Sequence, residues 1–259
     1  MNLLTSRRLE KGAVVGLSVA SFVLVWYGGS LIVPQLVPGP QRVLPLTAEI
    51  LDEPGPRGYT GLYHLQASLV RVFIIVAISM VVSVFVGTLM GVSKPIEEAT
   101  SLWLPLWMAV PDVVLILLVM IVFGFGDVSV IVGVTFLSTP FGIVNMWQGM
   151  KDLDADLTEM ADAFDANRRH VWRYIYIPHL VPYIFASGRY LLGQIWKIVL
   201  VAEAFGISTG MGAIIRFWYQ QGELAVIFAY LVLFIGVVFA IEYLLIAPLQ
   251  YRWFRWRPE

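Results

Sequence analysis

Residues 66–92 read QASLVRVFIIVAISMVVSVFVGTLMGV, a run of 27 residues whose one charged side chain is Arg71. A bilayer core about 30 Å thick is crossed by a helix of roughly 20 apolar residues. A helix that is apolar on all its faces must be buried in protein or in lipid. This stretch therefore predicts a membrane-spanning helix.

The same kind of segment recurs along the chain. Of its 259 residues, 59% are hydrophobic and 14% are charged, which leaves too few polar residues to cover a soluble domain of this length. The six predicted spans are Gly12–Val33, Gln66–Val92, Ser101–Phe123, Val128–Met150, Pro178–Phe205 and Leu224–Pro248. The first is too long, and lacks a clear small-residue cleavage site, for a signal peptide, so we read it as a retained span. We predict an all-α integral membrane protein with about six transmembrane helices.

Orientation follows from the basic residues in the connections, because cytoplasmic loops carry an excess of Lys and Arg. If the N-terminus is cytoplasmic, three basic residues lie outside: Arg42, Arg57 and Arg216. Eleven lie inside: Arg7, Arg8, Lys11, Lys94, Lys151, Arg168, Arg169, Arg173, Arg252, Arg255 and Arg257. This bias predicts that both termini are cytoplasmic, which requires an even number of spans.

Two of the three long connections are predicted to lie outside. Pro34–Leu65 is rich in Pro and Gly, with a short helix expected near Pro45–Leu51. Ile207–Glu223 contains the stretch Met211–Gln221, which has the character of a short interfacial helix. The chain has no cysteine, so disulfides and Cys-type metal sites are excluded. We expect no nucleic-acid partner and no metal site, because the three histidines, expected in loop or interface positions, lack metal-ligand spacing.

The third long connection, Lys151–Ile177, is predicted to be cytoplasmic and to hold two short amphipathic helices. Apolar residues of its first half follow helical spacing: Leu153, Leu157, Met160, Ala161 and Phe164. Asp165-Ala166-Asn167 then predicts a break, because Asp and Asn tolerate turn geometry. The apolar faces of such short helices need either a bundle of their own or the groove of a partner.

A family resemblance favours the partner's groove. Residues 159–166 read EMADAFDA and residues 177–182 read IPHLVP, and together they resemble the cytoplasmic signature of ABC importer permeases. SLVR at 68–71, GTLMG at 87–91, ASGR at 186–189 and VAEAFG at 201–206 extend the resemblance, most closely to the nitrate, sulfonate and taurine subfamily. The resemblance covers about residues 65–257. It implies a type I permease core there, with residues 151–177 as its coupling segment and residues 1–64 as an N-terminal span and outside loop.

The sequence departs from the family signature at two positions. Asp165 stands where the signature has Gly, and Met160 replaces an Ala. A Gly at such a turn supplies a positive φ, which Asp also adopts at times. Pairing with a second, different permease that keeps the Gly is one explanation for the departure.

The resemblance implies that the chain works in an assembly. We find no Gly-x-x-x-x-Gly-Lys-Ser/Thr motif, so no ATP site is expected in this chain. Cofactors are expected on the partners alone: ATP and Mg on two separate ABC ATPase subunits. The other implied partners are a second permease, identical or homologous, an extracytoplasmic solute-binding protein and the lipid of a bacterial inner (plasma) membrane. The residues implied in coupling to the ATPase are Thr158, Glu159, Ala161, Asp165, Ala166, Asn167 and Arg168. The solute implied is a small anion such as a sulfonate, taurine or nitrate, or a vitamin precursor.

Ionisable residues at membrane depth tend to face the bundle interior or a water-filled path. Arg189 and Glu203 lie about 21 Å apart along one helix and cannot pair, so each needs a partner from elsewhere. Asp112 is the candidate partner of Lys197 or Arg189, and Glu242 is expected to snorkel or to pack. The predicted translocation path contains Asp112, Asn145, Arg189, Lys197 and Glu203. The alternative is a purely structural role, most of all for Arg189 and Glu203.

Two other function classes remain open from the residues alone. A self-contained secondary transporter or channel would often show inverted repeats and paired broken helices. We see neither, although Pro105, Pro111 and Pro140 could interrupt two spans. An intramembrane enzyme needs convergent catalytic groups. Asp112 and Asp127 are placed too differently to form such a pair.

Overall fold

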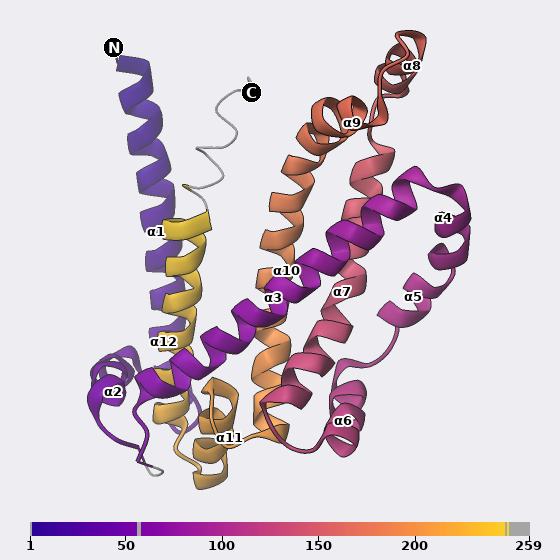
Figure 1. Cartoon of the computed structure of the whole chain (residues 1–259). Coiled ribbons are helices and arrows are strands. Elements are labelled where there is room, and N and C mark those ends of the chain that lie inside the picture. The colour runs from indigo at the N-terminus through magenta and orange to yellow at the C-terminus, as the bar shows by residue number, and fades with distance from the viewer. Residues whose placement is uncertain (1, 56–57, 247, 249–259) are drawn as a thin grey trace. The chain divides into compact units, whose positions relative to one another are not determined.

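The computed structural model describes residues 2–55, 58–246 and 248, and every regular element within these ranges is a helix (Figure 1). The predicted all-α class is confirmed. The α-helices are α1 (Asn2–Ile32), α2 (Pro40–Asp52), α3 (Gly61–Val92), α4 (Lys94–Ser101), α5 (Trp103–Met108), α6 (Asp112–Phe123), α7 (Asp127–Lys151), α8 (Ala155–Ala163), α9 (Arg168–Val171), α10 (Ile177–Gly206), α11 (Met211–Gln221) and α12 (Leu224–Ala240). Two π-helical turns, η1 (Trp172–Tyr176) and η2 (Ile241–Ile246), precede α10 and follow α12.

Four helical stretches within the described residues are long and apolar enough to cross a membrane: Gly61–Val92, Asp127–Lys151, Arg168–Gly206 and Leu224–Leu244. A fifth is counted if the bent pair Lys94–Met108 and Asp112–Phe123 forms one span. The apolar part of α1, Gly16–Ile32, is shorter. That the first predicted span, Gly12–Val33, crosses the membrane therefore stays a prediction.

The span predicted at Ser101–Phe123 is interrupted at Pro111, one of the prolines expected to be able to break it. The chain instead forms α4, α5 and α6, and the axis turns by 96° between Met108 and Asp112. Pro111 has an extended backbone and directly precedes α6. Proline disfavours helical geometry in the residue before it and donates no hydrogen bond, so the break falls where Pro111 stands. Pro140 lies inside α7, which continues to Lys151 without a break.

The chain forms two compact units. The first contains Met1–Tyr63 and Ile215–Phe239. Within it the indole N–H of Trp26 donates to the carbonyl of Pro38 at 3.0 Å, and its ring stacks on Phe228. The expected short helix near Pro45–Leu51 is present as α2, which begins earlier because Pro40 suits a first helical turn.

The second unit contains His64–Ile214 and Ala240–Glu259, and its core is built around α7 and α10, which lie side by side (Figure 1). α3 crosses α7 closely at Gly87, where an added Cβ would lie 2.6 Å from the Cβ of Met146. Small residues at such crossings let helices approach each other in a membrane. α8 and α9 lie beyond the adjoining ends of α7 and α10.

Candidate functional site

Of the two short helices predicted in the coupling segment, the first is present as α8 (Ala155–Ala163). The second is not a separate short helix, because Arg168–Tyr176 continues without a break into α10. α8 begins at the N-cap Asp154, whose carboxylate accepts a hydrogen bond from the backbone N–H of Asp156 at 3.1 Å. Asp156 lies in the first turn, where a negative charge is favoured by the helix dipole. Side-chain capping at this end stabilises a helix of nine residues that is too short to persist by itself.

The end of α8 explains how Asp165 replaces glycine. Asp165 has φ +49°, which places it in the left-handed region. Its N–H donates to the carbonyl of Asp162 at 3.1 Å, and the N–H of Ala166 donates to the carbonyl of Ala161 at 2.9 Å. These two bonds form a Schellman motif, in which glycine is the usual left-handed residue. The turn of the family signature therefore survives the substitution.

After this turn the chain enters a second helix at once. The side chain of Asn167 caps α9 by accepting from the N–H of Arg169 at 3.1 Å. α9, η1 and α10 form one continuous helical stretch of 39 residues, Arg168–Gly206. At about 1.5 Å per residue it is about 58 Å long, far more than a bilayer core requires. α9 and η1 therefore extend from the span toward α8.

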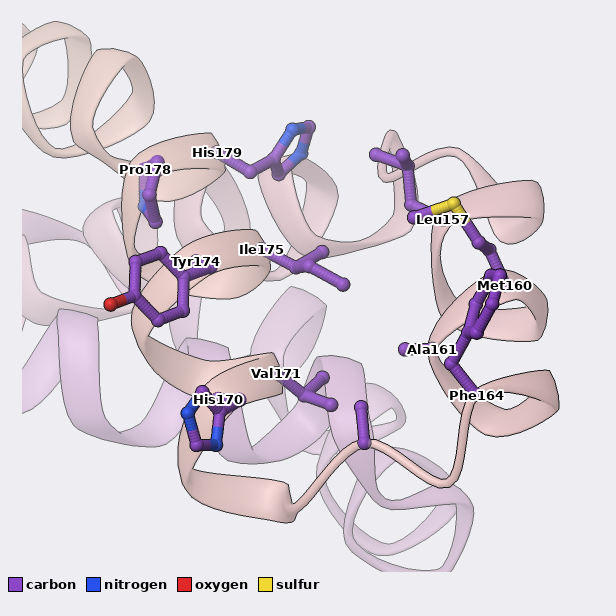
Figure 2. Close-up of a pocket in the computed structure, with 11 residues that line it drawn as sticks. Leu157, Met160, Ala161, Phe164, His170, Val171, Tyr174, Ile175, Pro178 and His179 are labelled. Atoms are coloured by element: carbon purple, nitrogen blue, oxygen red, sulfur yellow. The ribbon is translucent and has the colours of Figure 1, made fainter.

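A pocket of about 540 Å³ lies between α8 and this helix (Figure 2). Ala161 faces Val171 and Ile175 across it, and Pro178 and His179 line the end nearer the span. On α8 and at its C-cap the large apolar side chains stay open: Met160 is 51% exposed and Phe164 is 81% exposed. Exposed apolar groups gathered beside a concavity are typical of a protein interaction site.

The predicted coupling residues lie together on α8, on the turn that follows it and at the start of α9, and their role in coupling stays a prediction. Ala161 is buried under the pocket and Thr158 is half-buried. The exposed members are Glu159, Asp165, Ala166, Asn167 and Arg168. Four of the seven, Asp165 to Arg168, form the turn and the start of α9 and so determine the angle between the two helices.

The intramembrane charge Glu203 lies in a hydrogen-bonded network that is closed to solvent. Its side chain has no exposed surface. It accepts from the guanidinium of Arg71 at 2.6 Å, from the hydroxyl of Ser68 at 2.7 Å and from the N–H of Gly212 at 3.0 Å. A buried carboxylate with a cationic partner and further donors has the satisfied environment that such a charge requires.

Arg71 joins four segments. Its guanidinium also donates to Asp127 at the start of α7, at 2.7 Å, and to the hydroxyl of Thr209, at 2.7 Å. Glycines let the backbone close around Glu203: Gly210 has φ +106°, and a Cβ there would overlap the Glu203 carboxylate. The network thus fastens α3, α7, α10 and the loop before α11 to one another.

Sequence reasoning placed Glu203 correctly in need of a partner from another helix, but it did not identify Arg71. The pairing could have been found by comparing how deep in the membrane each charged residue lies. Arg71 lies near the start of the span α3 and Glu203 near the end of α10, which is predicted to run in the opposite direction, so both lie near the same membrane face. His64, expected in a loop or interface, is buried in α3 and accepts at Nδ1 from the N–H of Gly210 at 3.1 Å.

The expected partner of Arg189 was wrong. Arg189 forms an ion pair with Glu242 of η2, and not with Asp112. Glu242 was expected to snorkel or to pack, and it instead supplies the counter-charge. Arg189 and Glu203 therefore both have partners, which fits the structural alternative better than a role in a solute path.

The other predicted path residues do not form a cluster. Asp112 is exposed in the first turn of α6, where the free N–H groups of the helix end favour a carboxylate without a cationic partner. Lys197 is exposed on α10, and among the described residues no ion pair joins it to Asp112. Asn145 is half-buried on α7. The break at Pro111 makes Asp112 the first residue of α6, at a helix end and not within a longer helix.

Comparison with known protein families gives a match over most of the second unit. Residues 79–255 match the model of the family described as "binding-protein-dependent transport system inner membrane component". The match contains the whole coupling segment and α10.

Individual proteins agree with the family match. The taurine transport system permease protein TauC of Escherichia coli strain K12 is 26% identical over 77% of this chain and 74% of its own length. The nitrate import permease protein NrtB of Synechococcus elongatus is 26% identical over 78% of this chain and 74% of its own. Among solved structures, the MetNI methionine ABC transporter in an inward-facing conformation aligns with a TM-score of 0.62 and 20% identity, over 71% of this chain and 91% of that one. At that identity the likeness shows the fold alone.

Proposed function

The chain belongs to the family of inner membrane components of binding-protein-dependent transport systems, and on that premise we propose that separate ATPase subunits drive it through α8. It has the type I permease fold and is the permease subunit of an ABC importer. The proposal concerns the partners, the direction of coupling and the solute.

The observation that carries the proposal is the open apolar surface around the pocket of α8. α8 is capped at both ends, and its apolar side chains remain partly open: Leu157 is 41% exposed, Met160 51% and the C-cap Phe164 81%. A groove on an ATPase that accepts this helix would bury them, in the manner of a helix-in-groove interface. ATP-dependent closure of two ATPases would then displace the two α8 helices of a permease pair.

The free energy enters the permease through differential binding. A ligand or partner shifts a conformational equilibrium only by as much as it binds one conformation better than the other. The ATPase pair must therefore prefer one spacing of the α8 helices when ATP is bound and another when it is not. A short, rigid helix suits this role because it transmits a displacement instead of absorbing it.

For the solute we propose a small anion of the sulfonate or nitrate kind, delivered by a separate extracytoplasmic binding protein. The support is the likeness to permeases named for taurine and for nitrate. Both termini and α8 are proposed to lie in the cytoplasm of a bacterium, in agreement with the excess of Lys and Arg in the corresponding connections.

Reconstitution into liposomes tests the proposal. We expect the complex with its ATPase and binding protein to take up radiolabelled taurine or nitrate when ATP is supplied on the ATPase side, while the chain alone transports neither. Transport by the chain alone, driven by an ion gradient, would establish the competing reading of a secondary transporter. Failure of any ATPase to copurify with the chain would contradict the coupling role of α8.

A further inference from the structure

The adjoining ends of α7 and α10 are joined by two side-chain hydrogen bonds. The Nε2 of His179 lies 2.7 Å from the carbonyl oxygen of Gly149. Because a carbonyl oxygen only accepts, Nε2 carries the proton in this contact. The hydroxyl of Tyr183 donates to the carboxylate of Asp152 at 2.9 Å. We call these four residues the base clasp.

The side chains of the base clasp also pack closely against the backbone of α7. A Cβ on Gly149 would lie 2.5 Å from Cγ of Tyr183, so the ring rests directly on the backbone of α7. The rings of His179 and Tyr183 are 5.4 Å apart and tilted by 40°. Beneath them, the buried Met146, Met150 and Leu180 form an apolar cluster against which Tyr183 packs. The two helix ends therefore have a defined relative position.

The clasp closes the coupling segment into a loop. Its two bonds join residues that are 30 and 31 positions apart in the sequence, and α8, α9, η1 and their turns lie between them. Along the chain, α8 is joined to α7 through the non-helical Asp152–Asp154 and to α9 through the non-helical Phe164–Asn167. If the helix ends were free to separate, these joints could absorb a displacement of α8.

We propose that His179 and Tyr183 are positioning residues of the transport cycle: they hold α7 and α10 together, so that a displacement of α8 moves both spans as one rigid pair. This inference rests on the proposed docking of the ATPase at α8. The apolar cluster keeps the two helices in contact, whereas the clasp fixes the register and angle of their ends. Loss of the clasp is therefore expected to weaken coupling while the subunit still assembles.

The native chain has no cysteine, so two introduced cysteines can carry spin labels at chosen positions. Gln148→Cys and Ile177→Cys, both exposed, report on the distance between the two helix ends in the full complex with ATPase and binding protein. With the clasp intact, we expect one narrow distance distribution that is the same with and without ATP. With His179→Ala and Tyr183→Phe, the distribution should broaden and should change with ATP.

Transport per ATP hydrolysed gives the functional readout. We expect the complex with the double variant to hydrolyse ATP but to move severalfold less solute per ATP. His179→Gln keeps an N–H donor, so it should restore much of the ratio of solute moved to ATP hydrolysed. Tyr190→Phe removes a hydroxyl from an exposed tyrosine on the same helix and is the matched control, with an unchanged ratio.

Two results would overturn the inference: an unchanged distance distribution in the double variant, or an unchanged ratio of transport to hydrolysis. The single variant Tyr183→Phe, which removes one hydroxyl group, applies the same two criteria if the double variant does not assemble. These outcomes differ from failure of the proposed function, in which the unaltered chain would not bind an ATPase at all.

Discussion

Two carboxylates share Arg71, but they lie in different environments. Glu203 has no exposed surface, whereas the side chain of Asp127 is 66% exposed. An exposed ion pair stabilises little because water solvates both charges in its absence. A buried charge that loses its partner has no such substitute. Arg71 is therefore needed chiefly for Glu203, and Asp127 adds an outer contact.

Arg71→Ala and Asp127→Asn should accordingly differ. Arg71→Ala leaves Glu203 buried without a cation and is expected to cost about 3–5 kcal/mol, while Asp127→Asn is expected to cost at most about 1 kcal/mol. Thermal unfolding of the purified chain in detergent measures both. Similar losses in the two variants would contradict the view that the buried pair dominates the network.

The left-handed backbone of Asp165 gives a second contrast. Asp165→Gly should leave stability and coupling intact, because glycine adopts positive φ without steric cost. Asp165→Val should be destabilising by about 1–2 kcal/mol, because a side chain other than Gly, Asn or Asp is strained there. ATPase binding should weaken in parallel if the turn sets the angle between α8 and α9. Equal behaviour of the Val and Gly variants in unfolding and pull-down experiments would refute this account.

Lys197 is an intramembrane charge available to a solute, because it is exposed on α10 and none of the ion pairs among the described residues contains it. If it lines the path of an anion, Lys197→Gln should lower the uptake rate at unchanged ATPase assembly. Asp112→Asn is the companion variant and should also alter uptake. Initial rates at several solute concentrations, in the reconstituted complex, decide the matter. Wild-type rates in both variants would remove these residues from the path.

At the scale of elements, the sequence predicted helices and turns correctly where neighbouring residues determine them. Met211–Gln221 was expected to be a helix and forms α11, and the break at Asp165–Asn167 lies where turn-forming residues stand. The bend after Pro111 was not predicted as such, because proline also occurs within intact spans, as Pro140 does in α7. The pairs Arg71–Glu203 and Arg189–Glu242 join residues more than 50 positions apart, and hydropathy patterns contain no information on such pairs.

The exposed face of α8 predicts an outcome that separates docking from folding. Phe164 is 81% exposed, so Phe164→Ala should change the thermal stability of the chain only slightly. ATPase binding should weaken, because a large apolar side chain that an interface buries supplies much of its free energy. Tyr219→Ala on α11, where the tyrosine is 72% exposed, is the control and should retain binding. Retained ATPase binding in the Phe164 variant would place the contact elsewhere.

At the scale of the whole molecule, the number of membrane crossings depends on the bent pair. If α4, α5 and α6 together cross the membrane, the positions before and after them lie on opposite sides. If they form a re-entrant loop, the two positions lie on the same side. The predicted excess of Lys and Arg inside requires the crossing, because it places Lys94 in the cytoplasm together with both termini and α8.

Single cysteines in the otherwise cysteine-free chain distinguish these arrangements. In intact cells, a membrane-impermeant maleimide should label Phe125→Cys and Gln221→Cys, while Lys94→Cys and Asp156→Cys should react only after the membrane is opened. All four positions are exposed, so a failure to react reports the side of the membrane and not burial. Labelling of Phe125→Cys and Lys94→Cys from the same side would make the bent pair a re-entrant loop. The number of spans would then be odd, and the two termini would lie on opposite sides of the membrane.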